Sequence, residues 1–151
     1  MTQVECIQKT LEHIIRVQQL LSQVTSSVLE HAFGHDISKL SEPELSIFTE
    51  YTPKLKDSTY GSEEYKTFLK DMKIALDHHY IMNSHHPEHF KVGISQMNLI
   101  EIIEMLADWK ASSERHKDGN LLRSIEQNQE RFKYSNEFKE LLINTVNYLN
   151  W

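Results

Sequence analysis

The sequence predicts an all-α protein, a single-domain helical bundle of about six to seven helices over residues 1–151. Apolar residues recur at helical spacing along most of the chain, and no stretch shows the alternation of a β-strand. A length of 151 residues with 39% hydrophobic residues suits one domain with its own core. Neither an internal repeat nor a low-complexity linker divides the chain.

The first helix begins at a capping box of Thr2 and Glu5 and continues with apolar residues at helical spacing. The serine-rich segment SQVTSS at 22–27 predicts a break in this helix. A second helix then runs over roughly 24–35 and ends near the doublet His35-Asp36.

The third helix is predicted to open at Ser41 as N-cap, with Pro43 in its first turn. The segment PKLKDSTYGS at 53–62 is the most loop-like part of the chain, because it combines proline, glycine, serine and aspartate. A fourth helix follows over about 62–83.

A loop is predicted over HHPEHFKVG at 85–93, and Ser95 then caps a strongly apolar fifth helix. That helix ends at the turn KDGN, residues 117–120. Two amphipathic helices close the chain, near LLRSIEQNQERF at 121–132 and NEFKELLINTVNYL at 136–149.

Charge and composition exclude several classes of protein. The formal net charge is −6 and no Lys/Arg cluster occurs, so we expect no binding of a nucleic-acid polymer. Cys6 is the single cysteine, which predicts a reducing compartment. The sequence has no signal-peptide pattern and no run of about 18 apolar residues, so we expect a cytoplasmic protein with no membrane contact.

Histidines are concentrated in two places. His78, His79, His85, His86 and His89 fall within twelve residues, and His31 and His35 lie beside Asp36. Any one of them could cap a helix end or remain solvated. As a group they would repel one another when protonated and would gain most by sharing a metal.

Imidazole and carboxylate together suit Mn, Fe, Co, Ni or Zn, bound as one or two ions. Such an ion lowers the pKa of its water and attracts phosphate oxygens, which makes phosphoester hydrolysis the reaction most easily built from these residues. The sequence contains no HExxH, no zinc-finger spacing and no phosphate-binding glycine loop.

Three segments in this order resemble the H…HD…D signature of HD-domain metal-dependent phosphohydrolases: HIIRV at 13–17, HAFGHDISKL at 31–40 and MLADWKASSER at 105–115. HDISK is similar to the frequent HDIGK form. The histidine-rich segment is similar to that of a small group of bacterial and phage HD-like proteins. The resemblance implies an HD-type helical bundle in which four residues bind one metal, namely His13, His35, Asp36 and Asp108.

Other residues are candidates around that centre. One or more of His79, His85 and His86 are expected to face the same cavity as ligands of a second metal or as phosphate contacts. Lys39, Glu44 and His79 are the candidate catalytic residues, and either Glu42 or Glu44 would orient the attacking water. The candidate substrate-binding residues are Lys39, His86, Lys110 and Arg115.

Alternatives remain at several of these positions. His13 could be a hydrogen-bonded core histidine, and Asp108 could face solvent or pair with Lys110 or Arg115. The sequence does not determine which of His31, His78 and the later histidines reach the site.

The function predicted from these residues is a metal-dependent phosphohydrolase for a small nucleotide or nucleotide-like phosphoester. One alternative is a non-catalytic nucleotide-binding helical module with a degenerate site. The other is a di-iron oxygenase, because a minority branch of HD proteins, typified by inositol oxygenases, uses such a centre.

Overall fold

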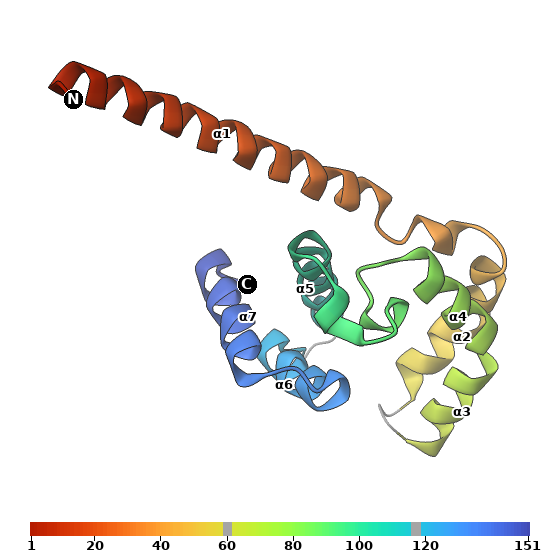
Figure 1. The fold of residues 1–151 in the computed structure, drawn as a ribbon. Coiled ribbons are helices and arrows are strands. Elements are labelled where there is room, and N and C mark those ends of the chain that lie inside the picture. The colour runs from red at the N-terminus through yellow and green to blue at the C-terminus, as the bar shows by residue number, and fades with distance from the viewer. Residues whose placement is uncertain (59–61, 116–118) are drawn as a thin grey trace. The chain divides into compact units, whose positions relative to one another are not determined.

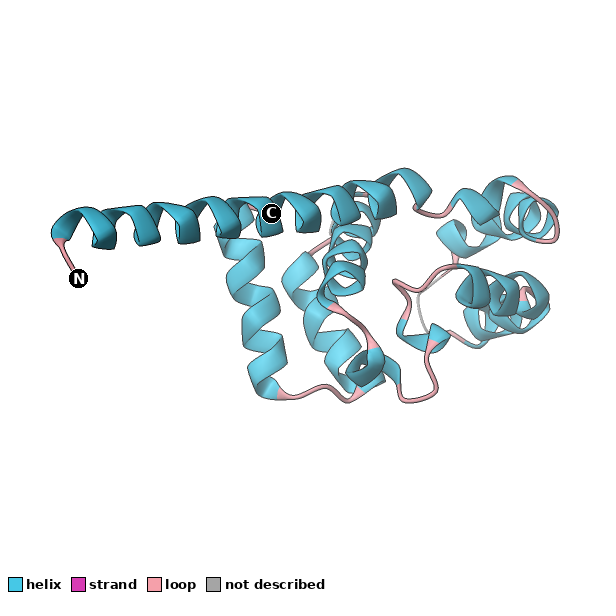
Figure 2. Cartoon of the chain, turned by 45° about the horizontal axis from the view of Figure 1, so that its top comes forward, coloured by secondary structure: helices cyan, strands magenta, loops and turns pink. Residues whose placement is uncertain are grey.

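The computed structural model describes residues 1–58, 62–115 and 119–151, and all regular structure within these ranges is helical (Figures 1 and 2). The all-α prediction is therefore confirmed for the described residues. The chain divides into two compact units, Met1–Gly34 and His35–Trp151. The assignment of 1–151 to a single domain stays a prediction.

The first unit is one continuous helix, α1, Gln3–Gly34. Thr2 and Glu5 form the expected capping box, because each backbone N–H donates to the side chain of the other. The predicted break at 22–27 is wrong. The hydroxyls of Ser22, Thr25 and Ser26 donate to carbonyls four residues earlier, so these three side chains are satisfied within the helix.

The second unit begins with the 3₁₀ helix η1, Ile37–Leu40, followed by α2, Glu44–Asp57. The prediction of Ser41 as N-cap of this helix is wrong: Pro43 is the N-cap, and the Ser41 hydroxyl donates to the Ser38 carbonyl. The predicted loop at 53–62 is helical up to Asp57, with Pro53 inside the helix. The rest of that predicted loop includes 59–61, which lie outside the described residues.

The helix predicted over 62–83 is divided into two helices, α3, Glu63–Asp71, and α4, Lys73–Met82. Ser62 caps α3 by accepting from the Tyr65 amide. The division lies at Met72, which is only 1% exposed and takes a backbone conformation with ψ near 0°. Neither glycine nor proline marks this position, so the sequence carried no signal for the break.

Two short 3₁₀ helices, η2, Pro87–His89, and η3, Gly93–Gln96, lead to α5, Leu99–Glu114. Asn98, and not Ser95, caps α5, in a capping box with Glu101. The predicted turn after α5 includes 117 and 118, which lie outside the described residues. Two amphipathic helices then follow as predicted, α6, Leu121–Phe132, and α7, Asn136–Leu149.

The second unit contains two packed groups of helices. α2 packs against α3, α4 and η1, while α6 packs against α5 and α7 (Figure 1). The main hydrophobic core lies in the second group and consists of Ile102, Met105, Leu106, Leu121, Ile125, Tyr134, Leu142 and Val146. Among the helices in the described ranges, none is long and apolar enough to cross a membrane.

Tyr134 makes this core sensitive to alkaline pH. Its hydroxyl donates to the Ile125 carbonyl, and burial raises the pKa of the phenol to about 12. The unfolded phenol ionises near pH 10, so the contribution of Tyr134 to folding is complete below that pH and decreases as the pH rises toward 12. Between pH 10 and 12, this phenol should cost the wild type about 2 kcal/mol of its free energy of unfolding. Tyr134→Phe should not show this part of the decrease. Denaturant unfolding at several alkaline pH values measures the free energy of unfolding of both proteins. An equal decrease in the wild type and in Tyr134→Phe would contradict this role.

Candidate metal centre

The site begins at Asp36, where the backbone takes a left-handed conformation. Asp36 has φ 56° and ψ 14°, a conformation that short polar side chains tolerate better than most. The Asp36 carbonyl accepts from the Lys39 amide, which starts η1, and the Lys39 ammonium lies 2.6 Å from Asp36 Oδ2. Burial acts to raise the pKa of Asp36, but the hydrogen bond and charge of Lys39 outweigh it and keep that pKa below its ordinary value.

Glu104, on α5, contacts two imidazoles through a single carboxylate oxygen. His35 Nδ1 and His85 Nδ1 each lie 2.9 Å from Glu104 Oε1. We assign the proton to Nδ1 in both rings, because a carboxylate oxygen can only accept. The Nε2 atoms of His35 and His85 then carry lone pairs that face away from Glu104.

Glu44, at the start of α2, likewise contacts the imidazoles of two histidines of α4. It is fully buried, with His78 Nδ1 2.7 Å from Oε1 and His79 Nδ1 2.8 Å from Oε2. Burial acts to raise the pKa of Glu44, but hydrogen bonds from His78 and Ser38 keep it below its ordinary value. The pairing of His79 Nδ1 with Glu44 leaves His79 Nε2 as an acceptor.

Four donor atoms converge between η1, α4 and the segment before η2. They belong to Asp36, His79, His85 and His86, and all lie within 4.8 Å of one another. Two of these atoms, Asp36 Oδ1 and His85 Nε2, are buried without a hydrogen-bond partner among the described residues and lie 3.6 Å apart. Because both are acceptors in the assigned states, they are unfavourable neighbours unless a cation lies between them.

The spacing of these donors fits a divalent ion. Metal–nitrogen bonds of about 2.0–2.1 Å place neighbouring ligand atoms about 2.9–3.4 Å apart in octahedral or tetrahedral sites. His79 Nε2 lies 2.8 Å from His86 Nε2 and 3.3 Å from Asp36 Oδ1. The carboxylates behind His79 and His85 are the outer partners that commonly orient metal-binding imidazoles.

A second group of donors shares Asp36. His35 Nε2 lies 3.5 Å from Asp36 Oδ2 and 3.8 Å from Asp108 Oδ1. The hydrogen bond to Glu104 raises the pKa of His35 above its ordinary value, in spite of partial burial. The two oxygens of Asp36 therefore face two different groups of ligands.

Two of the histidines near Asp36, His79 and His86, are neutral donors. Burial lowers the pKa of His79, with a further contribution from Lys39. Burial, followed by the nearby His85 and His79, lowers the pKa of His86 to about 2. Neutral imidazole is the form that binds metals, so no proton has to leave His86 near neutral pH.

Most of the predicted ligands lie in this cluster. The structure brings together His35, Asp36 and Asp108 with His79, His85 and His86. His78 faces Glu44, and His89 Nδ1 pairs with the Tyr80 carbonyl. His13 and His31 belong to α1, in the other unit, so the role of His13 as a ligand stays a prediction.

The roles predicted for Glu44, Lys110 and Arg115 stay predictions. Both oxygens of Glu44 contact histidines, a position that suits orienting His78 and His79. The Lys110 ammonium pairs with Glu114, 2.9 Å away, and Arg115 is exposed at the end of α5. Neither of these two cations lies among the described residues that line the pocket beside the cluster.

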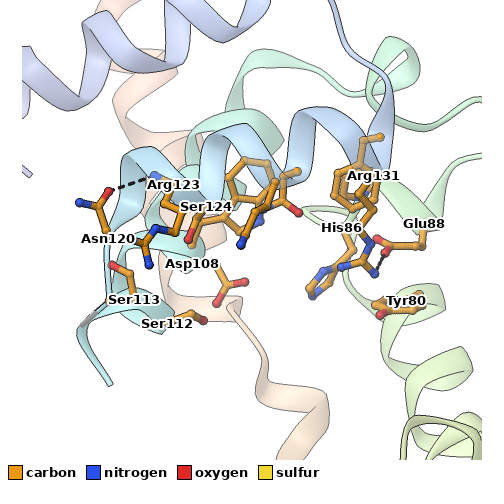
Figure 3. A pocket seen from close by; sticks show the side chains of 16 residues that line it. Tyr80, His86, Glu88, Asp108, Ser112, Ser113, Asn120, Arg123, Ser124 and Arg131 are labelled. Atoms are coloured by element: carbon orange, nitrogen blue, oxygen red, sulfur yellow. Dashed lines mark hydrogen bonds and ion pairs between the residues drawn. The ribbon is translucent and has the colours of Figure 1, made fainter. Parts of the chain in front are cut away.

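That pocket has a volume of about 570 Å³ and lies between α5, α6 and the segment from Tyr80 to Glu88 (Figure 3). His86 and Asp108 line it and also belong to the donor groups, so the cluster is open to the pocket through these two side chains. Among the described residues that line it, the cations are Arg123 and Arg131, neither of which was predicted from the sequence. Their signal was weak, because isolated arginines on an amphipathic helix are ordinary surface residues.

Comparison with known proteins gives a family without an activity. No curated protein and no solved structure matches the chain. A family model described as "Family of unknown function (DUF5662)" matches residues 2–150. Since the match extends over nearly the whole sequence, the chain belongs to the DUF5662 family.

Proposed function

We propose that the protein is a metal-dependent phosphohydrolase that acts on a small nucleotide or nucleotide-like phosphoester. The proposal rests above all on two buried acceptors, Asp36 Oδ1 and His85 Nε2, which lie 3.6 Å apart and have no hydrogen-bond partner in the described part of the chain. A divalent cation satisfies both atoms, together with the lone pairs of His79 and His86. A purely structural polar cluster would pair such buried acceptors with donors.

Hydrolysis is the reaction that these residues support best. A cation bound here supplies Lewis acidity toward water and toward phosphoryl oxygens. The pocket brings a substrate against Asp108 and His86, and the Asp108 carboxylate is placed to accept a proton from attacking water. Lys39, partly exposed beside Asp36, offers a positive charge to a phosphoryl oxygen.

A phosphate-release assay tests this proposal. Protein loaded with Mn²⁺ or Co²⁺ is incubated with nucleoside mono-, di- and triphosphates, and phosphate release is measured. Cleavage of cyclic dinucleotides by the same protein is followed by chromatography. We expect hydrolysis of at least one of them, a loss of about 100-fold or more in excess chelator, and recovery when the metal is returned. His85→Ala should lose the activity as well.

Three results would contradict it. Full activity in excess chelator would exclude the metal from the reaction. Nucleotide binding without turnover under several metals would favour the binding-module alternative. Oxygen consumption by the iron-loaded protein, without phosphate release, would favour the oxygenase.

A further inference from the structure

The charges around the pocket are distributed unevenly. Of the lining residues that the structure describes, four are formally charged: Glu88, Asp108, Arg123 and Arg131. Arg131 is engaged, because it pairs with Glu88 and its guanidinium lies 4.8 Å from the centre of the Phe132 ring. Asp108 belongs to a donor group of the metal cluster. Arg123 is the remaining charge.

Arg123 has no acidic partner within 4 Å in the described part of the chain, although the protein as a whole carries a charge of −6. Figure 3 shows it beside Asn120, Ser112 and Ser113, while His86 lies at the opposite side of the pocket. The Arg123 backbone N–H donates to the Asn120 side chain, which fixes the start of α6 and with it the origin of the side chain.

We propose that Arg123 binds a second anionic group of the substrate, separate from the phosphoryl group at the metal cluster. This inference rests on the proposed function, since the cluster receives the reacting phosphate through Asp108 and His86. A guanidinium binds phosphate through two parallel hydrogen bonds, and one without a competing carboxylate does so best. The substrate class is therefore a phosphoester with two separated negative groups, of a size that a pocket of about 570 Å³ accepts.

The side chains that line the pocket suit a substrate with two anionic groups joined by a polar and aromatic part. Hydroxyl and amide side chains of α6 line the pocket between Arg123 and Arg131 in the sequence, namely Ser124, Gln127 and Asn128, and Trp109 and Phe132 supply apolar walls. A sugar and a base fit such a lining by hydrogen bonds and ring contacts. A nucleotide with a phosphate at each end of its sugar would place one phosphate near His86 and Asp108 and the other near Arg123.

Equilibrium binding tests this inference without requiring turnover. Calorimetry on the Mn²⁺-loaded protein compares adenosine 5′-monophosphate with adenosine 3′,5′-bisphosphate, which differ only in the second phosphate. We expect the bisphosphate to bind about tenfold more tightly or better. Arg123→Gln should remove this preference and leave the affinity for the monophosphate unchanged.

Arg16→Gln is the matched control, because it removes the same charge from α1, outside the pocket. It should keep the preference of the wild type. Equal binding of both probes to the wild type, no binding of either, or equal weakening of both by Arg123→Gln would each overturn the inference. If the preference is present but neither compound is hydrolysed under any metal, the proposed function fails while Arg123 keeps its assigned role.

Discussion

Asp36→Asn should lose the bound metal while keeping the fold. Asparagine tolerates the left-handed backbone conformation that Asp36 adopts, so the backbone before η1 can keep this conformation. The substitution removes the charge that both donor groups share and replaces one ligand oxygen by an amide nitrogen. Loss of an outer partner alone lowers metal affinity about 10–100-fold, so loss of this shared ligand should cost more than about 100-fold.

Isothermal titration with Mn²⁺ and elemental analysis after dialysis measure this effect, and circular dichroism confirms the helix content. Asp71→Asn is a matched control, since Asp71 is exposed at the end of α3. It should bind metal as the wild type does. If Asp36→Asn retained the wild-type metal stoichiometry, Asp36 would not be a ligand.

Glu104→Gln should weaken metal binding by about 10–100-fold without removing any ligand. Glu104 accepts from the Nδ1 atoms of both His35 and His85, and its charge makes their Nε2 atoms better donors toward a cation. An amide oxygen preserves the shape of the contact and loses the charge. Glu126→Gln, an exposed change on α6, is the control.

A second readout separates this role from a merely structural one. The hydrogen bond to Glu104 is the largest cause of the raised pKa of His35, so Glu104→Gln should lower that pKa. Proton NMR of the His35 ring in chelator-treated protein follows this pKa directly. An unchanged pKa together with unchanged metal affinity would contradict the assignment of Glu104 as the partner of His35.

The sequence could predict what depends on neighbours along the chain. The helical period, the capping box of Thr2 and Glu5 and the position of Pro87 are local, and so the all-α class and the start of α1 followed from residue spacing. The break at Met72 and the continuity of α1 through 22–27 did not follow. Side-chain packing and backbone-satisfied hydroxyls override local preference at these two places.

The same distinction holds for the site. Residue type, residue order and the resemblance to HD-domain proteins led to the prediction of His35, Asp36, Asp108 and the histidines near Pro87, which the structure brings together. The same reasoning chose His13, whose role stays a prediction. The partners that orient them are distant in sequence, such as Glu104, 69 residues after His35, and the sequence alone gives no such pairing. Helix geometry does indicate which residues of α5 share the face of Asp108. Glu104 precedes Asp108 by four residues and shares its face of α5, whereas Lys110 follows by two and points to another face.

Anomalous X-ray diffraction from crystals of the Mn²⁺-loaded protein tests the central claim most directly. It locates the ion without depending on an activity or on a chosen substrate. The account predicts an anomalous peak within bonding distance of Asp36 Oδ1 and of the Nε2 atoms of His79, His85 and His86. A peak bound elsewhere, or no peak while Asp36 Oδ1 and His85 Nε2 share a proton, would contradict it.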